Sequence, residues 1–590
     1  MKKLICFLLV LAMLCVAFAG CSEKSAEETM EDITNEASEA TKTLSIWLMA
    51  EAEVSPEVEE QIEAAINTIT KSKFKAKIDL RYFTDEEEYY TALNAAFDKA
   101  YEESMNFDYG SIEDWLEDDD DDEEEESETE EETVLNEFGL PELKYPDIPD
   151  HQVDIFYING YDNFYYYNEL GLLNDIGEYV KSLSDDIFPD FLSMMKKVGG
   201  GTYAVPTNRL VGDYTFLLLN KEALKDANYS VSDFATVYDA NCQDFLDIIA
   251  ENYRDEYVPF YSEGNILENI PGVKYWGVDE NYNFCQDFSV FGSTYTSSAK
   301  YGSTSAITYG RNVLSTATFK SHVNAIKGYE FNGYYATDAE KATDKDFAVG
   351  YVIGGADVFD TYGDEYEIIT LATPFLTTEL LFSDMFSVGI YTADLSRSMD
   401  VLNFMNTDDT IKNILLYGVE GVHYEFVDSK KYFDENGDPY KVVRRICDKE
   451  GNPLYLMDNA KTGNMFNAYT LEGEDPNWIK YAQRTNRDAA ISLSMGFVFG
   501  YDGLPMSKEG FDDIKKISKD TYEGIINAKT QEELDDFLKK QEFKVNNNRS
   551  VIDALTDNDP TGELGLECQT FSEIYRQWLS DTGLFVFESN

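Results

Sequence analysis

The chain has 590 residues, of which 113 are acidic and 47 are Lys or Arg, and its formal net charge is −66 at pH 7. A charge this negative argues against nucleic acid or an anionic membrane surface as a partner, because both are negatively charged themselves. At roughly 100–200 residues per domain, a chain of this length is expected to form two or more lobes.

The N-terminus has the features of a secretory signal. Lys2 and Lys3 precede an apolar run over residues 4–18, which is too short for a transmembrane helix. The string FAGC that follows resembles the lipobox of bacterial lipoproteins, which implies that Cys21 carries the lipid and becomes the first mature residue. The alternative is ordinary cleavage beside an incidental cysteine. We predict a signal peptide with its lipidated cysteine over residues 1–21.

The next segment, residues 22–42, is rich in Glu, Ser, Ala and Thr and has almost no large apolar side chain. It cannot bury enough surface to fold, so we expect a disordered tether that reaches up to ~70 Å when stretched. No later segment is long and apolar enough to span a membrane. We therefore expect the body of the protein on the extracellular face of a bacterial cell membrane.

The first half of the body reads as alternating strands and helices. Residues 44–50 predict a buried strand, a helical pattern follows Pro56, and residues 76–83 predict a second strand. Asp85 is placed to cap the next helix. This alternation is the opening of an α/β domain.

An acidic block interrupts this pattern. Between residues 113 and 132, sixteen of twenty side chains are Asp or Glu. Like charges repel one another, so we predict a disordered, solvated insert over residues 109–134. A calcium-binding role is the alternative, but the spaced glycine of an EF-hand loop is missing.

Later segments continue the α/β pattern. Residues 153–158 are almost continuously apolar, as expected for a parallel strand covered on both faces, and a short helix that Gly171 can end follows them. Further strands are predicted over residues 201–206, 214–220, 347–353 and 385–391, a helix over 399–405, a β-hairpin or small meander around 440–447, and a helical pattern over 512–543.

The cysteines give no sign of a metal or redox site. Four cysteines besides Cys21 lie outside the predicted signal peptide, and their wide spacing contains no CxxC pair. A chain this long does not need disulfides for stability. Three disulfide connectivities are possible, but we favour buried free thiols for Cys242, Cys285, Cys447 and Cys568.

Several strings in order resemble the extracellular solute-binding lipoproteins of ABC importers, with the sugar-binding branch as the best match. They are LSIWLMAE, VDIFYINGYDN…GLL, GGTYAVPTNRL…YTFLLLNKEAL, SVGIYTADLSRSMDVLNFMNTD and LLYGVEGVHYEF. The resemblance implies an α/β, two-lobed, periplasmic-binding-protein-like (type II) fold with a hinge and an interlobe cleft. The chain would cross the hinge near residues 207–214, near 368–378 and again after His423.

On this resemblance, residues 43–212 and 371–425 form lobe 1, which contains the acidic insert, and residues 213–370 and 426–590 form lobe 2. Ligands of open α/β sheets lie beyond the carboxyl ends of the strands. Aromatic rings pack on the apolar faces of sugars, and Asp, Arg and Asn side chains bind their hydroxyls. The candidate ligand-binding residues at these ends are Glu51, Asn159, Tyr161, Asp162, Asn208, Arg209, Gly354 and Asp357, and the candidate aromatic platforms are Trp47 in the middle of the first strand and Trp276 in the second lobe.

Each candidate has a structural alternative. Trp47 and Trp276 could fill cores, Asn208 and Arg209 could serve an interlobe salt bridge, Gly354 could only make a turn, and Asp162 could only cap a helix. In the tyrosine-rich string YINGYDNFYYYNELGLL, helical spacing places Tyr166, Tyr167 and Leu170 on one face. We expect that face to be core, which leaves Tyr161 as the functional candidate.

The expected function is that of a lipid-anchored, monomeric binding protein that captures an oligosaccharide and delivers it to an ABC permease, without cofactor or metal. HExxH, P-loop and GxSxG motifs are absent, so we expect no enzyme. Glycoside hydrolysis needs only two carboxylates, so a hydrolase stays an alternative. The others are a binding protein for a peptide or another solute, and a surface glycan-binding lipoprotein or adhesin.

Overall fold

The computed structural model describes residues 41–105, 149–183, 191–193, 195–196, 200–234, 242–262, 266–278, 284–285, 287–294, 311–336, 345–427, 440–491 and 508–549. The predicted signal peptide, Cys21, residues 22–40 of the tether, the acidic insert and Cys568 lie outside the described residues. The predicted end of the tether at residue 42 is too late, because Lys42 already belongs to the first strand, Lys42–Met49. None of the described helices is long and apolar enough to cross a membrane. Cys242 is a buried free thiol as expected, whereas the free thiol of Cys447 is exposed.

The first lobe is built on a five-stranded sheet of order β2-β1-β3-β15-β4. β1 pairs in parallel with β2 and β3, whereas β15 returns antiparallel between β3 and β4. The strands are β1 Lys42–Met49, β2 Ala76–Phe83, β3 Ile155–Ile158, β4 Val205–Pro206 and β15 Met385–Val388. The predicted strand over 76–83 is confirmed in full, and the returning strand implied by the family resemblance is present.

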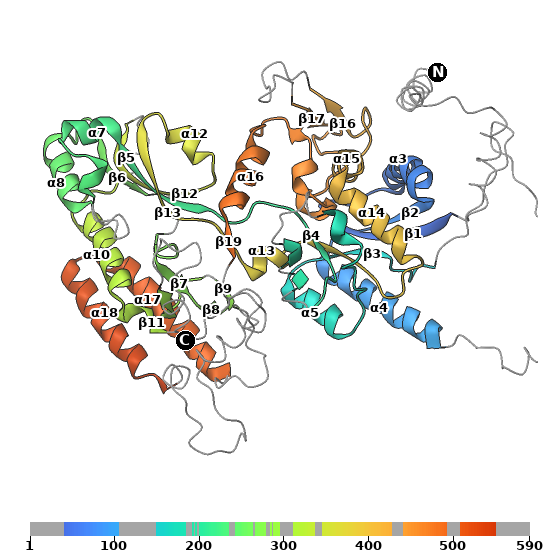
Figure 1. Cartoon of the computed structure of the whole chain (residues 1–590), viewed down its shortest axis with the longest axis horizontal. Coiled ribbons are helices and arrows are strands. Elements are labelled where there is room, and N and C mark those ends of the chain that lie inside the picture. The colour runs from blue at the N-terminus through green and yellow to red at the C-terminus, as the bar shows by residue number, and fades with distance from the viewer. Residues whose placement is uncertain are drawn as a thin grey trace, which may run out of the picture.

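Helices cover both faces of this sheet (Figure 1). They are α3 Pro56–Phe74, α4 Glu86–Met105, α5 Tyr161–Glu169, α14 Leu395–Thr407 and α15 Asp409–Tyr417, with a short 3-10 turn at Val180–Leu183. Asp85 caps α4 as predicted, since its side chain accepts a hydrogen bond from the Glu88 N–H at 2.9 Å. Side chains rather than another strand satisfy the outer edge of β2: the Asn67 amide bonds both the N–H and the C=O of Ile78.

A buried carboxylate fastens the layers of this lobe together. Asp154, just before β3, is fully buried. Its oxygens accept hydrogen bonds from the Ser45 N–H at 2.8 Å, from Thr392 Oγ1 at 2.7 Å and from the Ala393 N–H at 2.7 Å. β1, β3 and the segment between β15 and α14 are therefore held by one side chain.

The second lobe is built on a four-stranded sheet of order β13-β5-β12-β6. The strands are β5 Tyr214–Asn220, β6 Val258–Ser262, β12 Phe347–Gly354 and β13 Tyr366–Ala372, and the helices are α7 Lys221–Asp226, α8 Gln243–Asn252, α10 Ala317–Phe331 and α12 Val358–Tyr362. Along β5, Phe216 and Leu218 enter one core while Leu217 and Leu219 enter another. β5 is thus covered on both faces, which explains its apolar sequence.

A third core lies beside this sheet. It joins β7 Val273–Tyr275, β10 Phe291–Thr294 and β11 Arg311–Asn312 with the long helices α17 Lys508–Asn527 and α18 Gln531–Asn546. The helical pattern predicted over residues 512–543 is therefore two helices, and Thr530 caps the second. The smaller elements of this lobe are β8 Gly277–Val278, β9 Phe284–Cys285 and the 3-10 turns Val231–Asp233 and Val313–Ser315.

The two large sheets stand apart along the long axis, with α13, α16 and β19 between them (Figure 1). The connecting elements are β14 Phe375–Leu376, α13 Thr378–Phe382, α16 Trp478–Asp488 and β19 Ala490–Ile491, and β14 pairs in parallel with β19. With the pass over residues 207–213, the chain runs between the sheets three times.

The segment after His423 stays with the first lobe. β16 Tyr424–Phe426 pairs antiparallel with β17 Val442–Arg445, which pairs in parallel with β18 Thr470–Leu471, and the 3-10 turns Asn459–Thr462 and Met465–Asn467 precede β18. Tyr424, Val443, Tyr455, Met457 and Ala468 belong to the core of the first sheet. We therefore propose that lobe 1 extends to about residue 471 rather than ending at 425, with the third pass at residues 489–491.

His322 links the stability of the second lobe to pH. The side chain, on α10, is fully buried, and neither ring nitrogen has a hydrogen-bond partner among the residues that the structure describes. Burial lowers its pKa to about 3. In the unfolded chain His322 binds a proton near pH 6.5, whereas in the folded chain it does not. The buried His322 therefore has no effect on the free energy of unfolding well above pH 6.5 and lowers it below that pH.

We expect His322→Leu to remove this dependence. Between pH 7 and pH 5, the loss of unfolding free energy should be smaller by about 2 kcal/mol in the variant than in the wild type. Urea unfolding at the two pH values measures it. Phe319→Leu, a neutral change on the same helix, should lower stability equally at both pH values. Equal pH slopes for wild type and His322→Leu would contradict the assignment.

Candidate functional site

The three passes between the lobes meet at the carboxyl end of β3. The Thr207 N–H donates to the Asp384 carbonyl at 2.8 Å, and Thr207 Oγ1 donates to the Ala460 carbonyl at 2.9 Å. Asn208, which is buried, accepts at its carbonyl from the Met465 N–H at 3.0 Å. Residues 207–208 are therefore held by backbone contacts, which places Asn208 in the framework of the site rather than at its surface.

Arg209 is the first charged group of this junction. Its Nη1 donates to Ser383 Oγ and to Asp384 Oδ2. The Arg209 side chain is only 24% exposed and that of Asp384 only 12%. The other Asp384 oxygen accepts from the Tyr157 hydroxyl. Burial, reinforced by Asp384, raises the pKa of Tyr157 far above its ordinary value. The hydroxyl therefore stays protonated and donates a hydrogen bond to Asp384. Arg209 forms a salt bridge, but Asp384 directly precedes β15 of the first sheet, so this pair lies within the first lobe and is not the interlobe bridge raised as the alternative.

The loop after β3 carries three candidates. The Asn159 N–H donates to the Tyr90 hydroxyl at 2.9 Å. The Tyr161 ring, half-buried, packs edge-on against Phe382 with 4.8 Å between ring centroids. Burial raises the pKa of Tyr161, so its hydroxyl stays protonated and can donate. Phe382 directly precedes Ser383 and Asp384, the two residues that bind Arg209, so the loop with Asn159 and Tyr161 lies beside this junction.

Asp162 is not the cap of α5. The cap position is Gly160, whose φ of +83° favours glycine, and no side chain bonds the first turn there. Asp162 lies in the first turn, two residues after the cap, with an exposed side chain. It is positioned by the helix rather than used to start it, so it remains in the candidate site.

The predicted buried face of α5 is wrong. Tyr166 and Leu170 are 48% and 55% exposed, and the buried members of the helix are Phe164 and Tyr167. The helix turns Phe164 and Tyr161 toward Phe382 on α13, and this packing selects a different face from the one that the Tyr166–Leu170 spacing favoured. Tyr165 and Tyr166 are both exposed, and the Tyr165 ring lies beside that of Tyr161, with 6.1 Å between ring centroids.

Two consecutive residues of α16 join the junction to the second lobe. The Asn486 side chain, 4% exposed, accepts from the Val211 N–H and donates to the Arg209 carbonyl, both at 2.8 Å. Thr485 Oγ1 accepts from the Ala356 N–H at 3.0 Å. The loop over residues 354–357, at the end of β12, is therefore held next to Arg209.

The second-lobe side of this region is polar and aromatic. Asp357 is exposed at the start of α12, and a Cβ added at Gly355 would lie 2.8 Å from its carboxylate, so a larger residue at position 355 would require the Asp357 side chain to move. The Arg484 guanidinium lies 4.2 Å from the centroid of the Phe359 ring. The Tyr481 hydroxyl donates to Asp360 at 3.0 Å.

Glu51 lies at the end of β1 and is paired. Its carboxylate is 2.6 Å from Lys461 Nζ, and its N–H donates to the Leu456 carbonyl. The fully buried Lys412 holds the 459–463 loop through bonds to the Asn459 carbonyl, Thr462 Oγ1 and the Gly463 carbonyl at 2.6–3.0 Å. Glu51 is thus brought to the same end of the sheet as Asn159.

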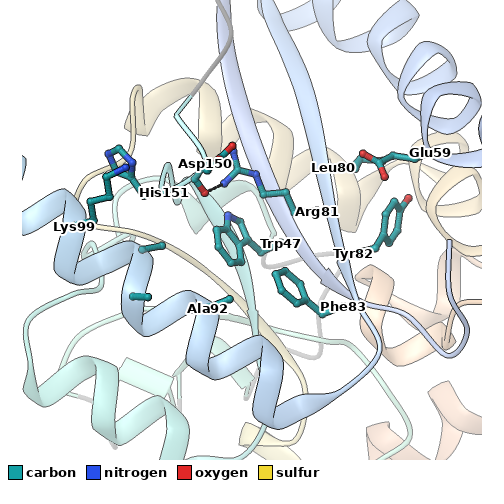
Figure 2. A pocket seen from close by; sticks show the side chains of 12 residues that line it. Trp47, Glu59, Leu80, Arg81, Tyr82, Phe83, Ala92, Lys99, Asp150 and His151 are labelled. Carbon is teal, nitrogen blue, oxygen red and sulfur yellow. Dashed lines mark hydrogen bonds between the residues drawn. The ribbon is translucent and has the colours of Figure 1, made fainter. Parts of the chain in front are cut away.

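Trp47 is elsewhere, in the wall of a depression of about 500 Å³ between β2 and α4. The ring is 3% exposed: Phe83 stacks on it at 5.4 Å, the Arg81 guanidinium lies 5.3 Å away, and its Nε1 donates to the Gln152 carbonyl at 3.0 Å. Figure 2 shows Trp47 between Arg81 and Phe83, with Lys99 and His151 at one end. A ring covered in this way offers no face to a sugar.

Trp276 is also core. It is 2% exposed, packs edge-on against Phe291 at 5.2 Å and belongs to the core with α17 and α18. We therefore leave both tryptophans out of the proposed site. The candidates that the structure brings together are Glu51, Asn159, Tyr161, Asp162, Arg209, Gly354 and Asp357.

Sequence reasoning missed α16 and the 459–467 loop. Tyr481, Thr485 and Asp488 of α16 recur at helical spacing and bind Asp360, Ala356 and Tyr214, respectively. That amphipathic period was the available signal, but the partners lie more than 120 residues away in sequence. Within the described residues, no group of His, Cys, Asp and Glu is arranged to hold a metal ion.

No protein-family model matches the chain. A carbohydrate ABC transporter substrate-binding protein of Streptococcus pneumoniae is 27% identical over 169 residues, which make up 25% of this chain and 32% of that protein. The chain is similar to a carbohydrate-binding component of an ABC transporter. This match confirms the predicted resemblance over the aligned segment, and it spans about a third of the relative's length.

Two solved structures align over most of the chain. The N-glycan transport solute-binding protein NgtS of S. pneumoniae has 17% identity and a TM-score of 0.48, covering 91% of this chain and 99% of its own. A solute-binding protein associated with a human-milk-oligosaccharide-binding ABC transporter of Bifidobacterium longum infantis has 12% identity and a TM-score of 0.39, covering 92% and 99%. Both likenesses are distant.

We expect Asn486→Ala to destabilise the protein by roughly 2 kcal/mol or more, because it leaves the buried Val211 N–H and Arg209 carbonyl without partners. Gln483→Ala, an exposed change on the same helix, should have almost no effect. Urea unfolding of both variants beside wild type measures the difference. Equal stability of the two variants would show that Asn486 does not hold the crossing.

Proposed function

We propose that the chain is the solute-binding component of an ABC importer and captures an oligosaccharide between its two lobes. The observation that supports this most directly is the junction of Arg209 with the 354–357 loop: polar and aromatic groups from the carboxyl ends of strands in two separate sheets are held at one place by Thr485 and Asn486. The sequence match to a carbohydrate ABC transporter substrate-binding protein supports the same function.

The groups at this place suit a sugar. Tyr161 offers a half-buried ring for an apolar sugar face. Asn159, Asp162 and Asp357 supply amide and carboxylate oxygens for hydroxyl groups. Arg209 uses Nη1 for its protein partners, and a guanidinium has further N–H donors to offer a ligand.

In the proposed mechanism, the ligand shifts the population toward a closed arrangement of the lobes. A ligand that contacts both lobes only when they are closed binds that arrangement more tightly, and this difference in affinity drives closure. No bond in the sugar is made or broken. The closed complex then delivers the sugar to the permease, and we propose that a lipid on Cys21 keeps the protein on the extracellular face of the membrane.

Thermal unfolding with a panel of ligands tests the proposal. The panel holds maltotriose, lacto-N-tetraose, Man5GlcNAc, single amino acids and a pentapeptide. At a concentration 100 times Kd, a ligand should stabilise the fold by about 2.7 kcal/mol, and we expect this from at least one oligosaccharide. Stabilisation by the peptide alone would contradict a sugar-binding role. Sugar fragments after incubation would show a hydrolase instead.

For the sugar that stabilises the protein, we expect Tyr161→Ala to weaken binding by about 30-fold, since losing one stacked ring costs roughly 2 kcal/mol. Tyr161→Phe keeps the ring and should lose less. Tyr101→Ala, an exposed change on α4, is the control and should bind like wild type. Titration calorimetry compares the four proteins, and unchanged affinity of Tyr161→Ala would remove Tyr161 from the site.

A further inference from the structure

The cations around the proposed site are already engaged by the protein. Arg209 is bound to Asp384 and Ser383. Lys461 is 2.6 Å from the Glu51 carboxylate. Arg484 lies over the Phe359 ring. All three groups therefore already interact with the protein, and Arg209 and Lys461 each have a carboxylate partner that offsets their charge before any ligand binds.

Two carboxylates near the same place have no such partner. Asp213 directly precedes β5, and Asp357 follows β12, whose Gly354 pairs with Tyr214 of β5. Within the part of the chain that the structure describes, neither forms an ion pair. Burial and the nearby Asp357 raise the pKa of Asp213, which is the response of a carboxyl group that lacks a compensating cation.

Asp360 adds to this negative side, because the Tyr481 hydroxyl rather than a cation binds it. A hydroxyl donates a hydrogen bond without cancelling the charge. The second-lobe edge of the proposed site is thus negative and rich in acceptors, which suits the hydroxyls of a neutral sugar and repels an anionic one.

We propose that the site selects neutral oligosaccharides and rejects those carrying uronic or sialic acid, and that Asp213 and Asp357 are the residues responsible. This inference rests on the proposed function and specifies the class of its ligand. A neutral sugar donates hydroxyl hydrogens to the two carboxylates. The carboxylate of an acidic sugar placed there is repelled by the two Asp carboxylates and gains no cation as a partner.

The experiment compares matched neutral and acidic sugars by titration calorimetry at pH 7. Lacto-N-tetraose is paired with its sialylated form, and maltotriose with its derivative in which the terminal CH₂OH is oxidised to a carboxylate. For each pair whose neutral member binds, the acidic member should bind about tenfold or more weakly. Near 1 M NaCl, where the screening length falls to about 3 Å, the ratio should shrink.

The variant Asp213→Asn/Asp357→Asn should bring the two affinities within about threefold of each other, because the repelling charges are gone while the shapes are kept. Glu523→Gln, an exposed change on α17, is the control and should keep the wild-type ratio. The single Asn variants serve if the double variant does not fold, and each should recover part of the ratio.

Equal binding of neutral and acidic sugars by wild type would overturn the inference and leave the proposed function intact. A wild-type ratio that survives in the Asn variants would overturn the assignment to Asp213 and Asp357. If no oligosaccharide of the panel stabilises the protein, the proposed function is wrong and the inference falls with it.

Discussion

The site depends on how the backbone is satisfied where the chain passes between the lobes. Residues 209–211 belong to no sheet, yet the Val211 N–H is buried and the Arg209 carbonyl is partly buried, so both need partners within the protein. The Asn486 amide supplies both, one as acceptor and one as donor. Because Thr485 binds the Ala356 N–H at the same time, the end of one helix fixes the position of Arg209 relative to the second-lobe loop.

On the first-lobe side of the site, the buried Lys412 side chain fixes the 459–463 loop as Asn486 fixes residues 209–211. Taking an ammonium group out of water costs several kcal/mol, and burial lowers the pKa of Lys412 well below its ordinary value. Three oxygen acceptors from residues 459–463 offset this cost. The loop they fix supports Thr207 and pairs with Glu51. Loops with little apolar packing of their own are therefore placed by two inaccessible polar side chains, Asn486 and Lys412.

These constraints explain what the sequence could predict. β2 and β5 were predicted residue for residue because their patterns report burial directly. The loops at strand ends followed from strand order, which is why Asn159, Arg209 and Gly354 could be placed at strand ends from the sequence, while their role in binding stays a prediction. The sequence could not show that neighbouring rings cover Trp47 and Trp276, and this burial is why we leave both tryptophans out of the proposed site. Asn486 and Lys412 were missed because an isolated polar residue gives no sign of partners that tertiary packing brings to it.

The tyrosine-rich helix α5 shows the same limit within nine residues. Aromatic side chains surround the helix, so periodicity could not choose which face is buried. Packing against Phe382 decided it: Tyr161 and Phe164 turn inward, and Tyr165 and Tyr166 stay exposed. This packing leaves the Tyr165 and Tyr166 rings exposed. It also places Tyr161 at the border between the core and the proposed ligand site.

The overall charge and the charge at the site act over different ranges. At physiological ionic strength the screening length is about 8 Å, so most of the 113 acidic side chains have little effect on a ligand already in place. They slow the approach of anions and keep the protein soluble. Discrimination between bound ligands has to come from charges within contact range, and in the described chain Asp213 and Asp357 are placed for it. A neutral glycan is indifferent to the first effect and favoured by the second.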